Sequence, residues 1–241
     1  MAITAPLLWL DGTMVESKTA GAPLMGHAAQ RGSLVFDVGS FRTTPRGPAL
    51  FRARDHVARF LRSVGIVGLE VRFDAETLVR AAARVVAESG SEEGLVRWSA
   101  FLTAREPDLV PRDLAAHVAV AAQTFQDPPR RAPIRVAVFD DARKAAPEVL
   151  PPDTKAAGAY LGPMIARKRA IAAGADDVVL LDKDGDIAEA PIANVFAVID
   201  GTLWTPPLGR ILPGITRDSV LAIARAMSIP VREDRLPLDR F

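Results

Sequence analysis

The fold of this chain is decided by two stretches of its sequence, TKAAGAY (residues 154–160) and GADDVVLLDKDGDIAEAPIANVFAVIDGTLWTPPLGRILPGITRDSV (residues 174–220). The first stretch places Lys155 shortly before Tyr160, the only tyrosine of the chain. The second places Glu189 among small residues and ends in a 214–216 turn ahead of apolar residues at helical spacing. An amine, a phenol, a carboxylate and a helix start therefore occur close together in the sequence.

Each of these features has an ordinary explanation and a chemical one. A lysine beside small residues is usually a solvated loop residue, but partial burial favours the neutral amine that attacks an aldehyde. A lone tyrosine such as Tyr160 usually packs in the core. Glu189 could simply accept backbone hydrogen bonds in a turn. Opposite a pyridine nitrogen, however, its carboxylate would keep that nitrogen protonated and make the ring an electron sink.

The turn at residues 214–216 completes this set. Thr216 is a plausible helix N-cap, and the N–H groups and dipole at a helix start attract phosphate. Taken alone, the turn is an ordinary cap. Together with Lys155, Tyr160 and Glu189 it fits the binding of pyridoxal phosphate, so the sequence indicates this cofactor.

Composition excludes several other classes of protein. The 241 residues include 30 basic and 29 acidic side chains, and a net charge of +1 gives no reason to expect a nucleic-acid-binding surface. The absence of cysteine excludes disulfides and thiol nucleophiles. The histidines, His27, His56 and His117, are not at metal-ligand spacing, so no metal site is expected. Without a signal peptide pattern or a long apolar window, we expect a cytoplasmic protein without membrane contact.

The hydrophobic pattern predicts a mixed α/β chain, of the α/β or α+β class, with two domains. An Asp-Gly pair between apolar runs predicts a hairpin at residues 7–15. Further strands are expected at 33–42, 49–52, 95–103, 117–122, 134–140, 177–182, 186–188, 194–199 and 202–205. Helices are expected at 54–64, 75–89, 160–173 and 217–228. The proline-rich segment 126–133 is the expected linker between a small N-terminal α/β domain (1–125) and a larger cofactor-binding domain (134–241).

These segments together resemble the class IV aminotransferases, the fold type IV enzymes that use pyridoxal 5′-phosphate, and most of all the branched-chain amino acid aminotransferases. The resemblance covers nearly the whole chain, with its strongest matches at residues 9–12, 32–36, 51–61, 96–97 and 155–218. It implies a small α/β domain and a larger domain with a β-barrel-like core. It also implies a homodimer or higher homo-oligomer, because a loop of the partner completes the substrate pocket in this family.

The resemblance also implies roles for single residues. Lys155 corresponds to the Schiff-base lysine, which also carries the proton between substrate and cofactor. Tyr160 would contact the ring hydroxyl oxygen, Glu189 the pyridine nitrogen, and Arg59 the phosphate. By itself Arg59 reads as a helix-surface arginine. The remaining residues that the resemblance places around the cofactor are Asn194, Gly214, Ile215 and Thr216.

Three departures from the family bear on the substrate. Arg31 and Leu95 stand where the branched-chain enzymes usually have tyrosines, while Phe36 and Arg97, two expected substrate-binding residues, are kept. Arg97 could bind the distal carboxylate of glutamate or 2-oxoglutarate, or form an ordinary surface ion pair. Arg31 is expected to bind substrate as a replacement carboxylate anchor through a bidentate pair. Lastly, the family continues for several dozen residues past Phe241, so we expect either a longer polypeptide, the favoured alternative, or an incomplete anion site.

The expected activity is transfer of an amino group between an amino acid or amine and a 2-keto acid, with altered carboxylate recognition. The small-molecule donor and acceptor are the expected partners. One alternative is a lyase resembling aminodeoxychorismate lyase, which releases pyruvate. A D-amino acid or (R)-amine transaminase is another, and a non-catalytic relative is a third. Residue identities leave the donor and the stereochemistry open.

Overall fold

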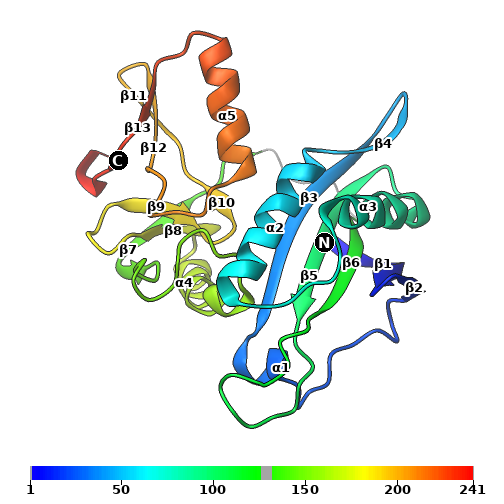
Figure 1. Ribbon diagram of the computed structural model, residues 1–241. Helices are drawn as coiled ribbons and strands as arrows, with labels where there is room; N and C mark the ends of the chain where they lie inside the picture. The colour runs from blue at the N-terminus through cyan, green and yellow to red at the C-terminus, as the bar shows by residue number, and fades with distance from the viewer. Residues whose placement is uncertain (1, 126–131, 241) are drawn as a thin grey trace. The chain divides into compact units, whose positions relative to one another are not determined.

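The computed structural model describes residues 2–125 and 132–240 (Figure 1). The chain divides into two compact units. Unit 1 comprises Met1–Arg131 and Lys155–Gly158, and unit 2 comprises Ala132–Thr154 and Ala159–Phe241. Most of the predicted linker 126–133 lies outside the described residues.

Unit 1 is built on a six-stranded antiparallel sheet with strand order β2-β1-β6-β5-β3-β4. Its strands are β1 (Ala2–Leu10), β2 (Thr13–Glu16), β3 (Leu34–Thr44), β4 (Gly47–Leu50), β5 (Glu93–Phe101) and β6 (His117–Phe125). The hairpin predicted at residues 7–15 is confirmed by the pairing of β1 with β2. The helices of this unit are α1 (His27–Arg31), α2 (Ala53–Val67) and α3 (Ala75–Ser89).

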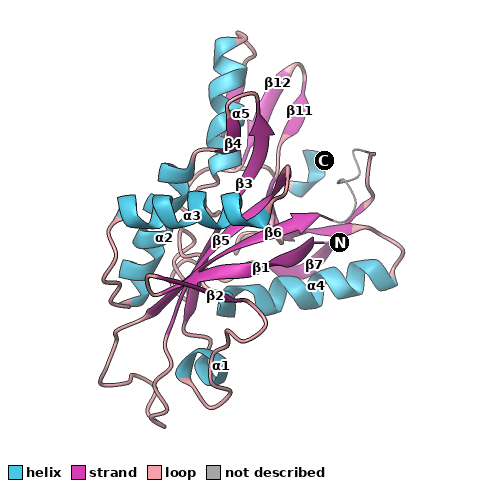
Figure 2. Ribbon diagram, turned by 90° about the vertical axis from the view of Figure 1, so that its right-hand side faces the viewer, coloured by secondary structure: helices cyan, strands magenta, loops and turns pink. Residues whose placement is uncertain are grey.

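The two long helices of unit 1 cover one face of its sheet (Figure 2). Side chains alternate along β5, so Val96, Trp98 and Ala100 are fully buried in the core beneath α2 and α3. The indole N–H of Trp98 donates to the carbonyl of Leu78 on α3 at 3.1 Å. The intervening residues of β5, including Arg97, are only half-buried on the opposite face. This alternation gives the sheet a packed face and a face with polar side chains.

Unit 2 contains a four-stranded sheet, β10-β9-β8-β7, and a three-stranded sheet, β11-β12-β13. The strands are β7 (Val136–Arg143), β8 (Asp177–Leu181), β9 (Ile187–Ala190), β10 (Ala193–Asn194), β11 (Ala197–Ile199), β12 (Thr202–Thr205) and β13 (Val231–Glu233). Its helices are α4 (Leu161–Ala172) and α5 (Ile215–Ala226).

The strand β8 is buried on both faces. Val178 and Leu180 pack with residues of α4, which lies along β7 and β8 (Figure 1). Val179 and Leu181 point the other way and pack with Trp204. Two-sided burial explains why the sequence of this strand is a continuous apolar run rather than an alternating one.

The structure differs from the predicted elements in a few places. The strand predicted at 194–199 is two short strands, β10 and β11, and α1 and β13 were not predicted. The last helix begins at Ile215 with Gly214 as its N-cap, so the prediction of Thr216 as N-cap is wrong. Glycine fits there because its extended backbone leads directly into the helix without a side-chain cap. Among residues 2–125 and 132–240, every helix is too short or too polar to cross a lipid bilayer.

Candidate active site

The backbone of Lys155 is held in unit 1 by β3 and α2. Its carbonyl accepts the N–H of Phe36 at 2.9 Å, and its own N–H donates to the Ser63 hydroxyl at 3.0 Å. The next residue, Ala156, forms an antiparallel bridge with Val35. Because Ser63 is fully buried on α2, Lys155 is attached to rigid secondary structure although it lies in a loop.

The side chain of Lys155 shares an aromatic neighbour with another cation. Its Nζ lies 5.1 Å from the centre of the Phe36 ring, and the Arg97 guanidinium carbon lies 3.9 Å from the same ring centre. Cations at these distances are attracted by the ring quadrupole. Three predicted site residues, Lys155, Phe36 and Arg97, are therefore brought together within unit 1.

Arg59 belongs to a buried network on the helix-covered face of the same sheet. Its Nε donates to Asp37 Oδ2 at 2.7 Å and its Nη2 to Asp37 Oδ1 at 2.8 Å, while His56 Nδ1 also bonds Asp37 Oδ1 at 2.8 Å. Asp37 is fully buried. Burial raises the pKa of Asp37, but the hydrogen bonds and charges of Arg59 and His56 outweigh it and leave that pKa below its usual value.

Arg31 lies elsewhere in unit 1, at the end of α1. Its guanidinium donates to the carbonyls of Gln30 and Pro107 at 3.1 and 3.3 Å, and the side chain is exposed. Leu95 lies on β5, two residues before Arg97, where it lines a hollow with Phe125. In this structure Arg31 thus braces the loop that carries Pro107.

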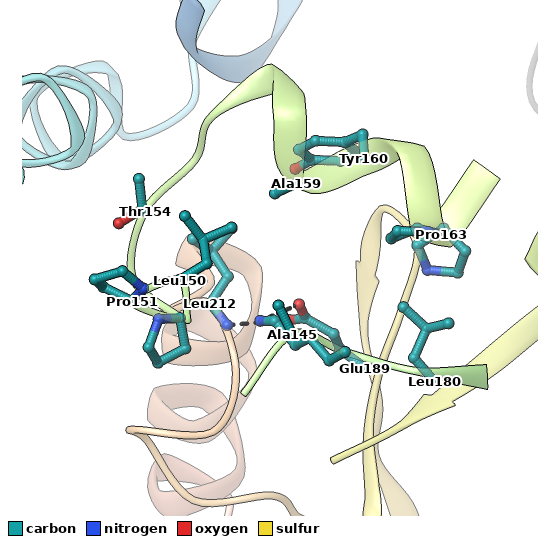
Figure 3. A pocket seen from close by; sticks show the side chains of 13 residues that line it. Ala145, Leu150, Pro151, Thr154, Ala159, Tyr160, Pro163, Leu180, Glu189 and Leu212 are labelled. Atoms are coloured by element: carbon teal, nitrogen blue, oxygen red, sulfur yellow. Dashed lines mark hydrogen bonds and ion pairs between the residues drawn. The ribbon is translucent and has the colours of Figure 1, made fainter. Parts of the chain in front are cut away.

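Tyr160 and Glu189 line one pocket of unit 2 (Figure 3). In this view Tyr160 lies above the hollow and Glu189 below it, with Leu150 and Pro151 along one side. Tyr160 ends the 3₁₀ turn Ala157–Tyr160 before α4, and Glu189 is the third residue of β9. The remaining lining residues are Lys144, Ala145, Pro152, Thr154, Ala159, Pro163, Leu180, Pro191 and Leu212.

Both oxygens of the Glu189 carboxylate have partners inside unit 2. Oε1 pairs with Lys144 Nζ at 2.5 Å, and Oε2 accepts the backbone N–H of Leu212 at 3.1 Å. The Glu189 side chain is only 15% exposed, and a carboxylate buried to this degree needs such partners. The pocket therefore presents a fixed, ionised carboxylate between apolar walls.

The remaining predicted residues gather near the start of α5. Asn194 pairs with Glu189 across the β9–β10 hairpin, and its side chain packs directly against Gly214. Ile215 and Thr216 form the first turn of α5. The segment from Leu212 to Thr216 thus connects the Glu189 carboxylate to a helix N-terminus, where backbone N–H groups favour an anion.

Replacing Gly214 by alanine should destabilise unit 2. A methyl group there would lie 2.6 Å from Asn194 Cγ, so the Asn194 side chain would have to move. We expect a loss of about 1–3 kcal/mol in the free energy of unfolding, typical of overpacking. Urea unfolding measures the change. As a control, Gly162→Ala in α4 meets no neighbouring atom and should be neutral or stabilising by up to about 1 kcal/mol; equal effects of the two substitutions would contradict this role of Gly214.

Several candidate residues were not predicted from sequence. Asp37, His56, Ser63 and Lys144 each contact a predicted site residue. Asp37 left a signal, an acid within an apolar strand pattern. His56 precedes Arg59 by three residues, which puts both on one helix face. Ser63 and Lys144 are distant in sequence from their partners, and nothing in their surroundings marked them.

Comparison with known proteins defines the class. The model of the family described as amino-transferase class IV matches residues 35–241. The chain therefore belongs to the class IV aminotransferases, and it is an enzyme dependent on pyridoxal 5′-phosphate.

Individual relatives agree with this assignment. The branched-chain-amino-acid aminotransferase of Pseudomonas aeruginosa is 28% identical over 243 residues, covering 99% of this chain and 79% of the relative. A crystal structure of the branched-chain aminotransferase from Thermoproteus uzoniensis with norvaline has a TM-score of 0.92 at 32% identity, covering 98% and 80% of the two chains. The T.th. branched-chain amino acid aminotransferase with pyridoxamine 5′-phosphate gives 0.92 and 32%, with coverage of 98% and 79%.

These findings confirm the predicted family, the mixed α/β fold of type IV, the aminotransferase activity and the cofactor. The pocket also fits that cofactor chemically. Glu189 supplies an ionised acceptor for a protonated ring nitrogen and Tyr160 a phenol for a ring oxygen. Leu150, Leu180 and Leu212 provide apolar walls for a flat ring. The roles of the individual residues are taken up as proposals below.

Proposed function

We propose that one pyridoxal 5′-phosphate molecule is bound by Lys155, Tyr160, Glu189, Arg59 and the 214–216 turn. The observation that supports this most strongly is the pocket in which Tyr160 and Glu189 face one hollow. Thr154 lines the same pocket, and Lys155 follows it directly in the chain. When bound, the cofactor supplies an electron sink for bond breaking at the substrate α-carbon.

The protein residues divide the remaining work. Lys155 Nζ binds the aldehyde carbon, and after release it moves the proton from the α-carbon. Its fixed backbone keeps that nitrogen in place. Glu189 holds a proton on the ring nitrogen, and Arg59, with the amides of Ile215 and Thr216, balances the phosphate charge. Asn194 fixes the turn at Gly214, as its packing there supports.

For the substrate we propose a branched-chain-type amino acid with glutamate or 2-oxoglutarate as its counterpart. The names of the relatives and the apolar Leu95 and Phe125 beside one hollow support an aliphatic side chain. Arg97, stacked on Phe36, supports carboxylate binding. Arg31 is a further anchor for a carboxylate, through its two guanidinium edges.

A donor panel tests this proposal. Holoenzyme is incubated with L-leucine, L-glutamate, D-alanine or (R)-1-phenylethylamine and either of two keto acids, and products are measured. We expect L-leucine with 2-oxoglutarate to react fastest, with ping-pong kinetics. Pyruvate formed without any acceptor would instead identify a lyase, and no turnover despite cofactor binding would contradict the transaminase proposal.

We also propose that the protein forms a homodimer. Four apolar side chains near Arg31 are strongly exposed: Leu24, Met25, Leu109 and Val110, at 78, 65, 71 and 66%. The loops that carry them are joined, since His27 Nε2 contacts the Leu109 carbonyl at 2.9 Å. Such a patch is typical of a protein interface. Sedimentation equilibrium checks the association, and a monomer at all concentrations would contradict it. The cytoplasmic location stays a prediction.

Arg59→Lys should weaken cofactor binding while keeping the charge opposite Asp37. An ammonium cannot reproduce the planar fork of a guanidinium that bonds a carboxylate and a phosphate together. We expect the dissociation constant for pyridoxal 5′-phosphate to rise by about 10- to 100-fold, measured by absorbance titration. Arg62→Lys, on the exposed face of the same helix, is the control and should bind as the wild type does. Equal affinity of the Arg59→Lys protein would remove Arg59 from the phosphate site.

A further inference from the structure

We propose that Lys144 is the permanent counter-ion of Glu189, which keeps this carboxylate ionised and correctly oriented for the ring nitrogen. This inference rests on the proposed role of Glu189 and adds a positioning residue to it. No sequence feature had suggested Lys144, which lies eleven positions before Lys155 in the chain.

The geometry of the pair supports a built contact. Lys144 Nζ lies 2.5 Å from Glu189 Oε1, and the two side chains are only 17 and 15% exposed. Lys144 directly follows β7, and its N–H donates to the Leu181 carbonyl at the end of β8 at 2.8 Å. Glu189 lies on β9, the neighbour of β8. Both partners are therefore fixed to one sheet.

The neighbouring charges are already engaged in pairs of their own. Lys144 also borders a second hollow, together with Asp182, Lys183 and Arg210. Arg210 pairs with Asp182 and, at 2.8 Å, with Asp184. Lys183 pairs with Glu148 at 2.7 Å. Among the described residues of this region, the carboxylate in contact with Lys144 is that of Glu189.

The contact has an electrostatic consequence for the ring nitrogen. A proton shared by a carboxylate and a pyridine can reside on either group. A cation touching the carboxylate stabilises its ionised form more than it disfavours a second cation beyond it, because the interaction falls with distance. Lys144 thus favours the proton on the ring nitrogen. It leaves Glu189 Oε2 with the Leu212 N–H, so the carboxylate plane stays fixed.

The first test uses the cofactor-free protein. A double-mutant cycle of Lys144→Met and Glu189→Gln, followed by urea unfolding, measures the coupling of the pair. We expect the coupling to change the unfolding equilibrium constant by about tenfold or more. The matched control cycle is Lys183→Met with Glu148→Gln, an exposed pair of the same residue types at 47 and 65% exposure. Its coupling should be about fivefold or less.

The second test reads the proton directly. Pyridoxal 5′-phosphate labelled with ¹⁵N in the ring is bound to each protein, and the ¹⁵N chemical shift reports protonation of that nitrogen. We expect a protonated signal in the wild type and in Lys144→Arg, and an unprotonated signal in Glu189→Gln. In Lys144→Met the signal should move towards the unprotonated position, whereas Lys183→Met should match the wild type.

The outcomes separate the two proposals. Coupling no larger than that of the control pair, or an unchanged ¹⁵N signal in Lys144→Met while Glu189→Gln shifts, would overturn the role of Lys144. A wild-type signal that Glu189→Gln does not change would instead overturn the proposed role of Glu189. The unfolding cycle is independent of that result, since it contains no cofactor.

Discussion

Lys155→Ala is expected to reduce the rate of transamination by at least about 10³-fold, because the substitution removes both the amine that binds the aldehyde and the group that moves the proton. The protein should still fold. The contacts of Lys155 with Phe36 and Ser63 use its backbone carbonyl and N–H, which alanine retains. Steady-state rates with a saturating donor and acceptor, together with the circular dichroism spectrum, measure both expectations.

Lys168→Ala provides the control for this experiment. Lys168 is exposed on α4, in the same sequence region as Lys155. Its replacement should leave the rate within about twofold of the wild type, as expected for a surface position. A Lys155→Ala protein that is folded and turns over at the wild-type rate would show that another group performs the chemistry.

Asp37→Asn is expected to lower the free energy of unfolding by about 3–5 kcal/mol. The substitution leaves the guanidinium of Arg59, whose side chain is 8% exposed, without the carboxylate that accepts two of its hydrogen bonds. Breaking a buried ion pair from one side costs this much because the remaining charge is uncompensated. Urea unfolding of the cofactor-free protein gives the value.

Two further variants separate this mechanism from a general loss of packing. Asp55→Asn removes the half-exposed partner of Arg52 on the same helix and should cost about 1 kcal/mol or less. Asp37→Asn combined with Arg59→Met removes both charges and should be more stable than Asp37→Asn alone. If the double variant is the less stable protein, the pairing of Asp37 with Arg59 is not what stabilises this region.

The pH dependence of unfolding provides a second readout of the same network. The pKa of Asp37 is lowered from its ordinary value of 3.8, so the folded state binds this proton less readily than the unfolded chain. The stability contributed by the carboxylate is therefore fully present above pH 3.8 and is lost as the pH falls through the folded pKa. Asp37→Asn should remove this part of the acid dependence.

The parts of the fold that could be predicted from sequence are those that local spacing determines. The helix expected at 75–89 is found at Ala75–Ser89, with Asp74 accepting the N–H of Thr77 as its N-cap. The strand at Thr202–Thr205 also has its predicted bounds. The start of α5 was misplaced because Thr216 is a good capping residue by type, whereas the backbone turns at Gly214.

The parts of the candidate site that could not be predicted depend on tertiary contacts. The motif that contains Arg59 was visible, but its partner Asp37 comes from a different strand and is placed beneath α2 only by the β3 register. Lys144 reaches Glu189 because β7, β8 and β9 are neighbours in one sheet. Pairings between distant segments leave no periodic signal in a sequence.

The central claim is that the amine of Lys155 bonds to the aldehyde of pyridoxal 5′-phosphate. The holoprotein can be treated with borohydride, digested, and analysed by mass spectrometry to locate the reduced adduct. We expect the label on the peptide that contains Lys155. A label on Lys144 or Lys168, or protein that carries none after incubation with excess cofactor, would contradict the claim.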